Sequence, residues 1–141
     1  MNTCRQDQFF GPVLVYVHKE GSEFHAYVDP FFVIGTGKTV TEALHSANEL
    51  LVSYFLAVSE ELSKHGSRKV QVLNPLDAES KRGAVATFQG MIFAQVRRVT
   101  SFKPECLPLQ PQPMNRIAKY LMTGEAKTVR MAGLQPIAAG A

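Results

Sequence analysis

The 141-residue chain is 45% hydrophobic, which is enough to form the core of one domain, with or without a small appendage. No segment approaches the roughly 18 consecutive apolar residues that a membrane-spanning helix requires. The start of the chain also lacks the basic and apolar regions of a secretory signal peptide. We therefore expect a cytoplasmic protein without a membrane partner.

Charge is divided unevenly along the chain. Residues 1–65 contain four Lys or Arg against eight Asp or Glu, whereas residues 66–141 contain eleven against four. The resulting net charges of −4 and +7 give the total of +3. A basic half suits a surface for nucleic acid or for an acidic protein. It equally suits packing of the two halves on each other or on a second subunit.

Two alternating segments near the N-terminus predict a β-hairpin. Residues 12–18 place a valine at every second position, and residues 23–29 also alternate apolar and polar side chains. The polar linker at residues 19–22 contains a glycine and suits the turn. A proline after residue 29 ends the second strand because it has no N–H for the ladder. Residues 31–34 then predict a short, buried third strand.

Residues 39–64 predict a long amphipathic helix. Thr39 and Glu42 have the spacing of a capping box, which satisfies backbone N–H groups of the first turn. At 1.5 Å per residue the helix is about 39 Å long, more than a small sheet requires. The apolar stripe consists of Ala43, Leu44, Ala47, Leu50, Leu51, Tyr54, Phe55, Val58 and Leu62. The polar face carries Glu42, His45, Glu49, Ser53 and Glu60.

The centre of this stripe is expected to form the core with the N-terminal strands. On the helix these residues are Leu51, Tyr54, Phe55 and Val58. On the strands they are Val13, Val15, Phe24 and Val28.

Beyond the helix the pattern is less regular. Residues 68–73 alternate and predict a fourth strand. Residues 74–77 combine an Asn cap, a proline and an acidic residue, which predicts the start of a short second helix. Residues 84–100 suit either one helical face or a pair of strands, and we favour a helix.

The C-terminal region has its own composition. Four prolines within residues 102–113 predict an extended linker. Two short helices, at residues 113–122 and 125–132, would give the tail the outline of a helix-turn-helix DNA reader. The second of these is barely two turns long, so we favour a docking or partly disordered arm over a DNA reader.

These elements predict an α+β fold in the order strand, strand, strand, helix, strand. A small antiparallel sheet would carry one long helix on one face, followed by a second helix or strand pair and a C-terminal appendage. The expected divisions are a domain at residues 1–101, a Pro-rich linker at 102–113 and a helical tail at 114–141.

The entrance to the long helix resembles that of HicB-like antitoxin domains, which carry a G-D-T-x-x-E-A-x-x-x-A-x-E motif there. The resemblance covers about residues 12–73, roughly half of the chain. Besides the two strands and Asp29-Pro30, it is carried by Gly37, Thr39, Glu42, Ala43, Leu44, Ala47 and Glu49. The chain departs from the motif at Lys38, where the family usually has Asp, and at residues 32–34, which replace a Pro-Gly-Cys-like turn.

The resemblance implies a partial ribonuclease-H-like fold without nuclease activity. Such a domain binds and blocks a small toxin ribonuclease, often as an oligomer that also binds its own operator DNA. The alternative is an inhibitor or assembly protein of a phage or mobile element that acts through protein–protein contacts. Neither hypothesis involves catalysis or a cofactor, and we do not predict an enzyme.

Three motifs bear on more specific chemistry. Glu42, His45 and Glu49 have a spacing that suits a divalent metal, but the wheel places them on the solvated face. The sequence Gly-Lys-Thr at residues 37–39 resembles the end of a phosphate-binding loop whose earlier glycine is missing. His18 and His25 could pair across the hairpin, although surface histidines without a function are commoner.

Two sets of residues remain as candidate binding surfaces. Val52 and Leu56 lie near the polar side of the long helix, which favours contact with a neighbouring subunit. The second set is a basic surface for an acidic protein or, alternatively, for nucleic acid. It consists of Arg97, Arg98, Lys103, Arg116, Lys119, Lys127 and Arg130.

Overall fold

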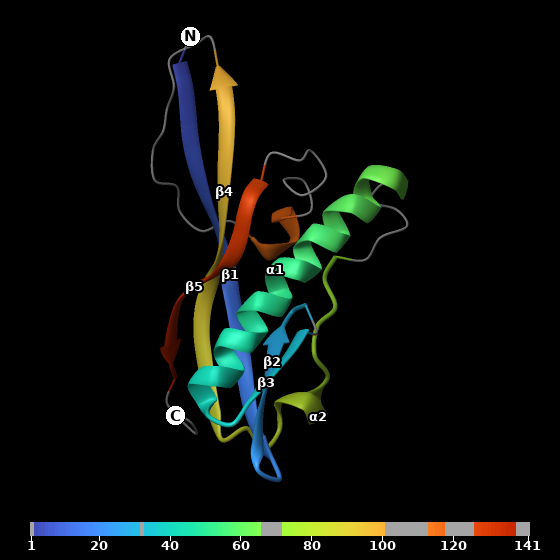
Figure 1. The fold of residues 1–141 in the computed structure, drawn as a ribbon, viewed down its shortest axis with the longest axis vertical. Coiled ribbons are helices and arrows are strands. Elements are labelled where there is room, and N and C mark those ends of the chain that lie inside the picture. The colour runs from blue at the N-terminus through green and yellow to red at the C-terminus, as the bar shows by residue number, and fades with distance from the viewer. Residues whose placement is uncertain (1, 32, 66–71, 101–112, 118–125, 138–141) are drawn as a thin grey trace.

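The computed structural model describes residues 2–31, 33–65, 72–100, 113–117 and 126–137, and within these it describes only the backbone of residues 2–8, 63, 65, 95–100 and 126–128. The predicted α+β fold is confirmed, because a five-stranded antiparallel sheet in the order β3-β2-β1-β4-β5 carries one long helix (Figure 1). The strands are β1 (Asn2–Glu20), β2 (Glu23–Asp29), β3 (Val33–Gly37), β4 (Ala86–Thr100) and β5 (Ala126–Pro136). The helices are α1 (Val40–His65), α2 (Ala78–Lys81) and the 3-10 turn η1 (Met114–Arg116).

The hydrophobic core lies between α1 and the sheet. Leu51 and Phe55 of α1 are buried together with Val13, Val15 and Val28 of the sheet, as predicted. Each such side chain contributes about 1.5–3 kcal/mol when it is removed from water. Of the other residues predicted to form the core, Val58 is buried, whereas Tyr54 and Phe24 are only partly buried.

The start of α1 is held by the predicted cap. Thr39 Oγ1 accepts the backbone N–H of Glu42 at 3.1 Å. The Glu42 carboxylate accepts the backbone N–H of Lys38 at 2.8 Å, one residue further back than in the usual capping box. Both side chains therefore satisfy backbone donors at the helix entrance.

Small residues bring β3 unusually close to α1. A Cβ atom on Gly35 would lie 2.2 Å from the backbone nitrogen of Ala47, and one on Gly37 would lie 2.5 Å from the Glu42 Cβ. Real atoms cannot approach to these distances, so only glycine fits at either position. Gly37, the glycine of the motif that resembled a phosphate-binding loop, is thus explained by packing.

Both edges of the sheet are closed by side chains of α1. The edge strand β3 donates the Thr36 N–H to Ser46 Oγ at 3.2 Å. The opposite edge strand β5 donates the Met131 N–H to Asn48 Oδ1 at 2.9 Å. Edge strands normally offer unpaired N–H groups to other chains. The sheet therefore curves around α1, and the helix satisfies one donor on each side.

The prediction of a helix at residues 84–100 is wrong. Residues 86–100 form the single strand β4, which pairs with β1 from Asn2↔Thr100 to Val17↔Ala86. The segment has the aromatic and β-branched residues of a strand, and β1 begins ten residues earlier than expected, which supplies a partner for its whole length. The predicted fourth strand at 68–73 falls mostly outside the described part: residues 68–71 are not described, and residues 72–73 are irregular.

The prediction of a helical tail is wrong for its second half. Residues 126–136 form the edge strand β5, paired with β4, so the helix-turn-helix outline does not exist there. Burial of Val129 and Met131 on either side of exposed Arg130 shows the two-residue period of a strand. Gly133 has a φ of +65° where the register with β4 shifts. Residues 101–112 and 118–125 lie outside the described part.

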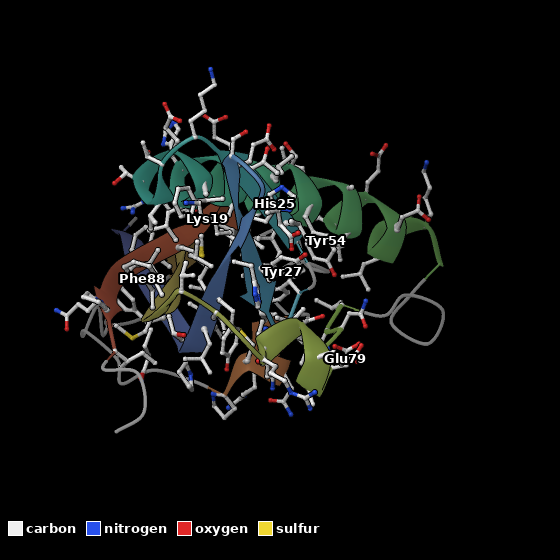
Figure 2. All side chains as sticks on the ribbon, turned by 90° about the horizontal axis from the view of Figure 1, so that it is seen from below. Lys19, His25, Tyr27, Tyr54, Glu79 and Phe88 are labelled. Atoms are coloured by element: carbon white, nitrogen blue, oxygen red, sulfur yellow. The ribbon has the colours of Figure 1, made fainter. Side chains whose placement is uncertain are left out.

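The short helix α2 lies on the side of the sheet opposite α1 (Figure 2). It begins one turn later than expected: Asp77 is its cap, accepting the Ser80 N–H at 2.8 Å. The residue expected as the cap, Asn74, instead donates its N–H to Pro30 O at 2.6 Å. Leu76 is buried and donates its N–H to Asp29 Oδ1 at 2.8 Å, so this segment is fixed to the end of β2.

Candidate functional site

The outward side of α1 carries the apolar residues that were predicted to contact another subunit. Leu56 exposes 67% of its surface, and Val52, one turn before it, is partly buried. Leu50, which was expected in the core, is 46% exposed because it lies at the margin of the stripe. Residues four apart are neighbours on a helix, so Val52 and Leu56 form one small apolar patch. We call these two residues the α1 patch.

The carboxylates and histidine beside the α1 patch do not form a metal site. His45 Nε2 and Glu49 Oε1 lie 2.8 Å apart, and both side chains are well exposed. Glu42 is one turn away and is engaged at the helix cap. Within the described residues there is no group of three or more His, Cys, Asp or Glu that could hold a metal ion. An exposed ion pair of this kind contributes little to stability.

The predicted basic residues are only partly brought together. Arg97 and Arg98 lie on β4, and Lys127 and Arg130 lie on the adjacent strand β5. Arg116 is exposed in η1. The other two predicted members, Lys103 and Lys119, lie outside the described residues. Strands β4 and β5 together contain these four cations and no Asp or Glu.

A row of aromatic and cationic side chains crosses β1, β4 and β5 on the sheet face away from α1. Phe9 pairs with Phe93, and Phe93 pairs with Arg130. The rings of Phe9 and Phe93 have centroids 5.3 Å apart and are tilted by 56°. The Arg130 guanidinium carbon lies 4.9 Å from the Phe93 centroid, which is a cation–π contact.

This row was missed because residues 84–100 were predicted to be helical. In a helix, Phe93 would have no cross-strand partners, so its position beside Phe9 and Arg130 could not be predicted. The sequence carries no alternation here, because Ile92, Phe93 and Ala94 are all apolar, and only the structure shows that Ile92 and Ala94 are buried while Phe93 points to the other face.

A depression next to this row lies along β4 and the end of β5. It has a volume of about 510 Å³ and is open to solvent. The residues that line it are Gln89, Gly90, Met91, Gly133, Gln135, Pro136 and Ile137. Gln89 pairs with Gln135 across the two strands, so two amide side chains come from one register row.

A second depression, of about 350 Å³, lies between the hairpin and α2. His18 Nε2 lies 2.6 Å from the carbonyl oxygen of Ser80, and the His18 ring meets Tyr27 edge-on with centroids 5.2 Å apart. His18 and His25 are direct cross-strand partners, as their spacing suggested.

The backbone N–H and side chain of Ser80 lower the pKa of Asp77. The contact between His18 and Ser80 docks α2 on the sheet.

Tyr54 links α1 to the segment before α2. Its hydroxyl donates to the carbonyl oxygen of Val72, and its ring packs edge-on against Phe31 and Phe55. Partial burial raises the pKa of the Tyr54 phenol, because removal from water disfavours the phenolate.

Comparisons with known proteins give no match: no family model, no curated protein and no solved structure is significantly similar to this chain. In the described part of the chain, no helix is both long enough and apolar enough to span a membrane.

Proposed function

We propose that the chain is a non-catalytic protein-binding module of the HicB antitoxin kind, which neutralises a small toxin ribonuclease by covering it. The proposal rests on the resemblance at the entrance to α1 and on one observation of the surface. That observation is the α1 patch, where Leu56 is the most exposed large apolar residue in the described part of the chain. Exposed apolar residues next to each other mark contact surfaces more often than isolated ones do.

The surroundings of the patch fit a basic partner. Helix α1 contains Glu42, Glu49, Glu60 and Glu61 but only Lys64 as a cation. Proteins that act on RNA are commonly basic, since the phosphate backbone must be neutralised. An acidic helix with a small apolar centre is therefore a suitable surface for such an enzyme. The proposal places both proteins in the cytoplasm and includes self-association through the same helix.

The test is capture of a partner and measurement of its activity. The tagged chain is used to isolate bound proteins from its native host, and each captured protein is then prepared alone and assayed for ribonuclease activity. We expect stoichiometric inhibition on addition of the chain, weakened at least about tenfold by Leu56→Arg, since contact-centre residues cost more than about 1.4 kcal/mol when lost.

Thr41→Arg is the matched control. It adds the same charge to an exposed position of α1, about 22 Å from residue 56, and should leave inhibition unchanged. A captured partner without ribonuclease activity would favour the alternative of an inhibitor or assembly protein. Inhibition that is identical in both variants would rule out the α1 patch as the contact.

A further inference from the structure

We propose that the face of β4 and β5 that points away from α1 binds single-stranded nucleic acid. This inference does not depend on the proposed antitoxin function, because it concerns the opposite face of the sheet and a different set of residues. Its centre is the row formed by Phe9, Phe93 and Arg130, and its continuation is the depression between Gln89 and Gln135. We call this surface the β4–β5 face.

Charge is the first reason for a polyanionic ligand. Strands β4 and β5 carry four cations and no acid, and the one whose side chain the structure describes, Arg130, lies on this face; β2 carries Glu23 and Asp29 and no cation. The sheet is therefore acidic toward one edge and basic toward the other. Because β4 and β5 come from segments 26 residues apart in the sequence, only the fold creates this basic edge.

Ring geometry is the second reason. Phe9 and Phe93 are partly exposed on a face where a solvated antiparallel sheet normally carries polar residues. Every nucleobase has a π-face that stacks on such a ring, and arginine adds a cation–π contact and a phosphate contact. The observed Arg130–Phe93 contact at 4.9 Å places a cation and a ring within reach of one nucleotide.

The depression supplies the third reason. The depression begins at Met91, two residues from Phe93 along β4, and extends to Gln89. The aromatic row and the depression therefore form one track of about 13 Å along β4. The amides of Gln89 and Gln135 each offer a donor and an acceptor, which suits the exposed edges of unpaired bases.

A duplex fits this surface less well than a single strand. Stacking on a sheet requires bases that are not already stacked and paired. Duplex readers instead place a helix in the major groove, and α1, the long helix of the described part, is acidic. The predicted recognition helix of the tail is strand β5.

The experiment measures fluorescence anisotropy of labelled oligo(U) and oligo(dT), each about 12 nucleotides long, with the full chain. We expect binding of at least one of them that is tighter than that of a duplex of the same length. Phe93→Leu should weaken binding about 5- to 150-fold, the effect of losing one stacked base. Arg130→Ala should lower the slope of log K against log salt by about 0.7.

The chain contains a matched control pair on its other strands. Lys19 lies over the ring of Phe24 at 5.9 Å, so Lys19→Ala and Phe24→Leu repeat the two changes away from the β4–β5 face. Both should bind as the wild type does, and circular dichroism melts check that all four variants fold.

Three outcomes would overturn the proposal. One is no binding of either oligonucleotide at about 100 µM protein in low salt, a concentration at which even non-specific binders respond. Another is an equal loss of affinity in Phe24→Leu. The third is displacement by poly-glutamate as effective as displacement by unlabelled oligonucleotide, which would make the face a site for acidic proteins.

Discussion

At the scale of single residues, the core depends on the α1 side chains that face the sheet. Leu51 has no exposed surface and belongs to the buried cluster between helix and strands. We predict that Leu51→Ala lowers the free energy of unfolding by about 2–5 kcal/mol, since it removes apolar contact and leaves a cavity. Urea unfolding measures the change, and Leu50→Ala, at a position 46% exposed, is the control that should lose much less.

Tyr54 makes stability depend on pH in the alkaline range. Burial raises the folded-state pKa of Tyr54 above the ordinary tyrosine value of 10.0, so the folded protein favours the neutral phenol. A raised pKa contributes stability that is fully present below about pH 10 and is lost as the pH rises through the folded-state value. We predict that Tyr54→Phe reduces the fall of the melting temperature above pH 10. An identical pH profile for both proteins would contradict this assignment.

At the scale of elements, β5 is held between β4 and α1. The Asn48 side chain accepts the Met131 N–H, so a polar residue on the helix satisfies one backbone donor of the edge strand. At the other edge of the sheet, Ser46 Oγ of α1 accepts the Thr36 N–H of β3 in the same way. This arrangement explains why α1 carries polar residues beside its apolar stripe.

Removal of the Asn48 amide should loosen β5 specifically. We predict that Asn48→Ala costs about 0.5–1.5 kcal/mol and speeds hydrogen exchange at the Met131 amide more than at amides of β2. Hydrogen exchange followed by NMR makes the comparison. Glu49→Ala, at the next and well-exposed position, should leave the exchange of β5 unchanged.

At the scale of the whole molecule, the two faces of the fold differ in charge and polarity. The outward side of α1 is acidic around the α1 patch, whereas the β4–β5 face carries Arg130 beside the rings of Phe9 and Phe93. Two such surfaces on opposite sides allow two macromolecules to bind at once. The proposed protein partner and the proposed nucleic acid would then not compete.

Self-association through α1 can be measured without any partner. We predict that the wild type forms an oligomer at micromolar concentration, and that Leu56→Arg shifts it toward the monomer by burying a charge in the contact. Light scattering gives the masses. A wild type that remains monomeric would remove Val52 and Leu56 as oligomer contacts.

The sequence by itself determined the local elements of the first half. The capping box at Thr39, the stripe that buries Leu51 and the alternating strands up to residue 29 all follow from contacts within one segment or between neighbours in the chain. Local hydrogen bonding and burial periodicity are sufficient there, because each signal acts over less than two turns or one hairpin.

Only the tertiary structure decided the second half. Residues 84–100 and 126–136 are strands because β1 extends to Asn2 and offers β4 a partner along its length, and β4 then offers one to β5. Pairing between segments this distant leaves no local signal that distinguishes a strand from a helical face. The row of Phe9, Phe93 and Arg130 is created by that same long-range register, so the sequence could supply its residues but not their proximity.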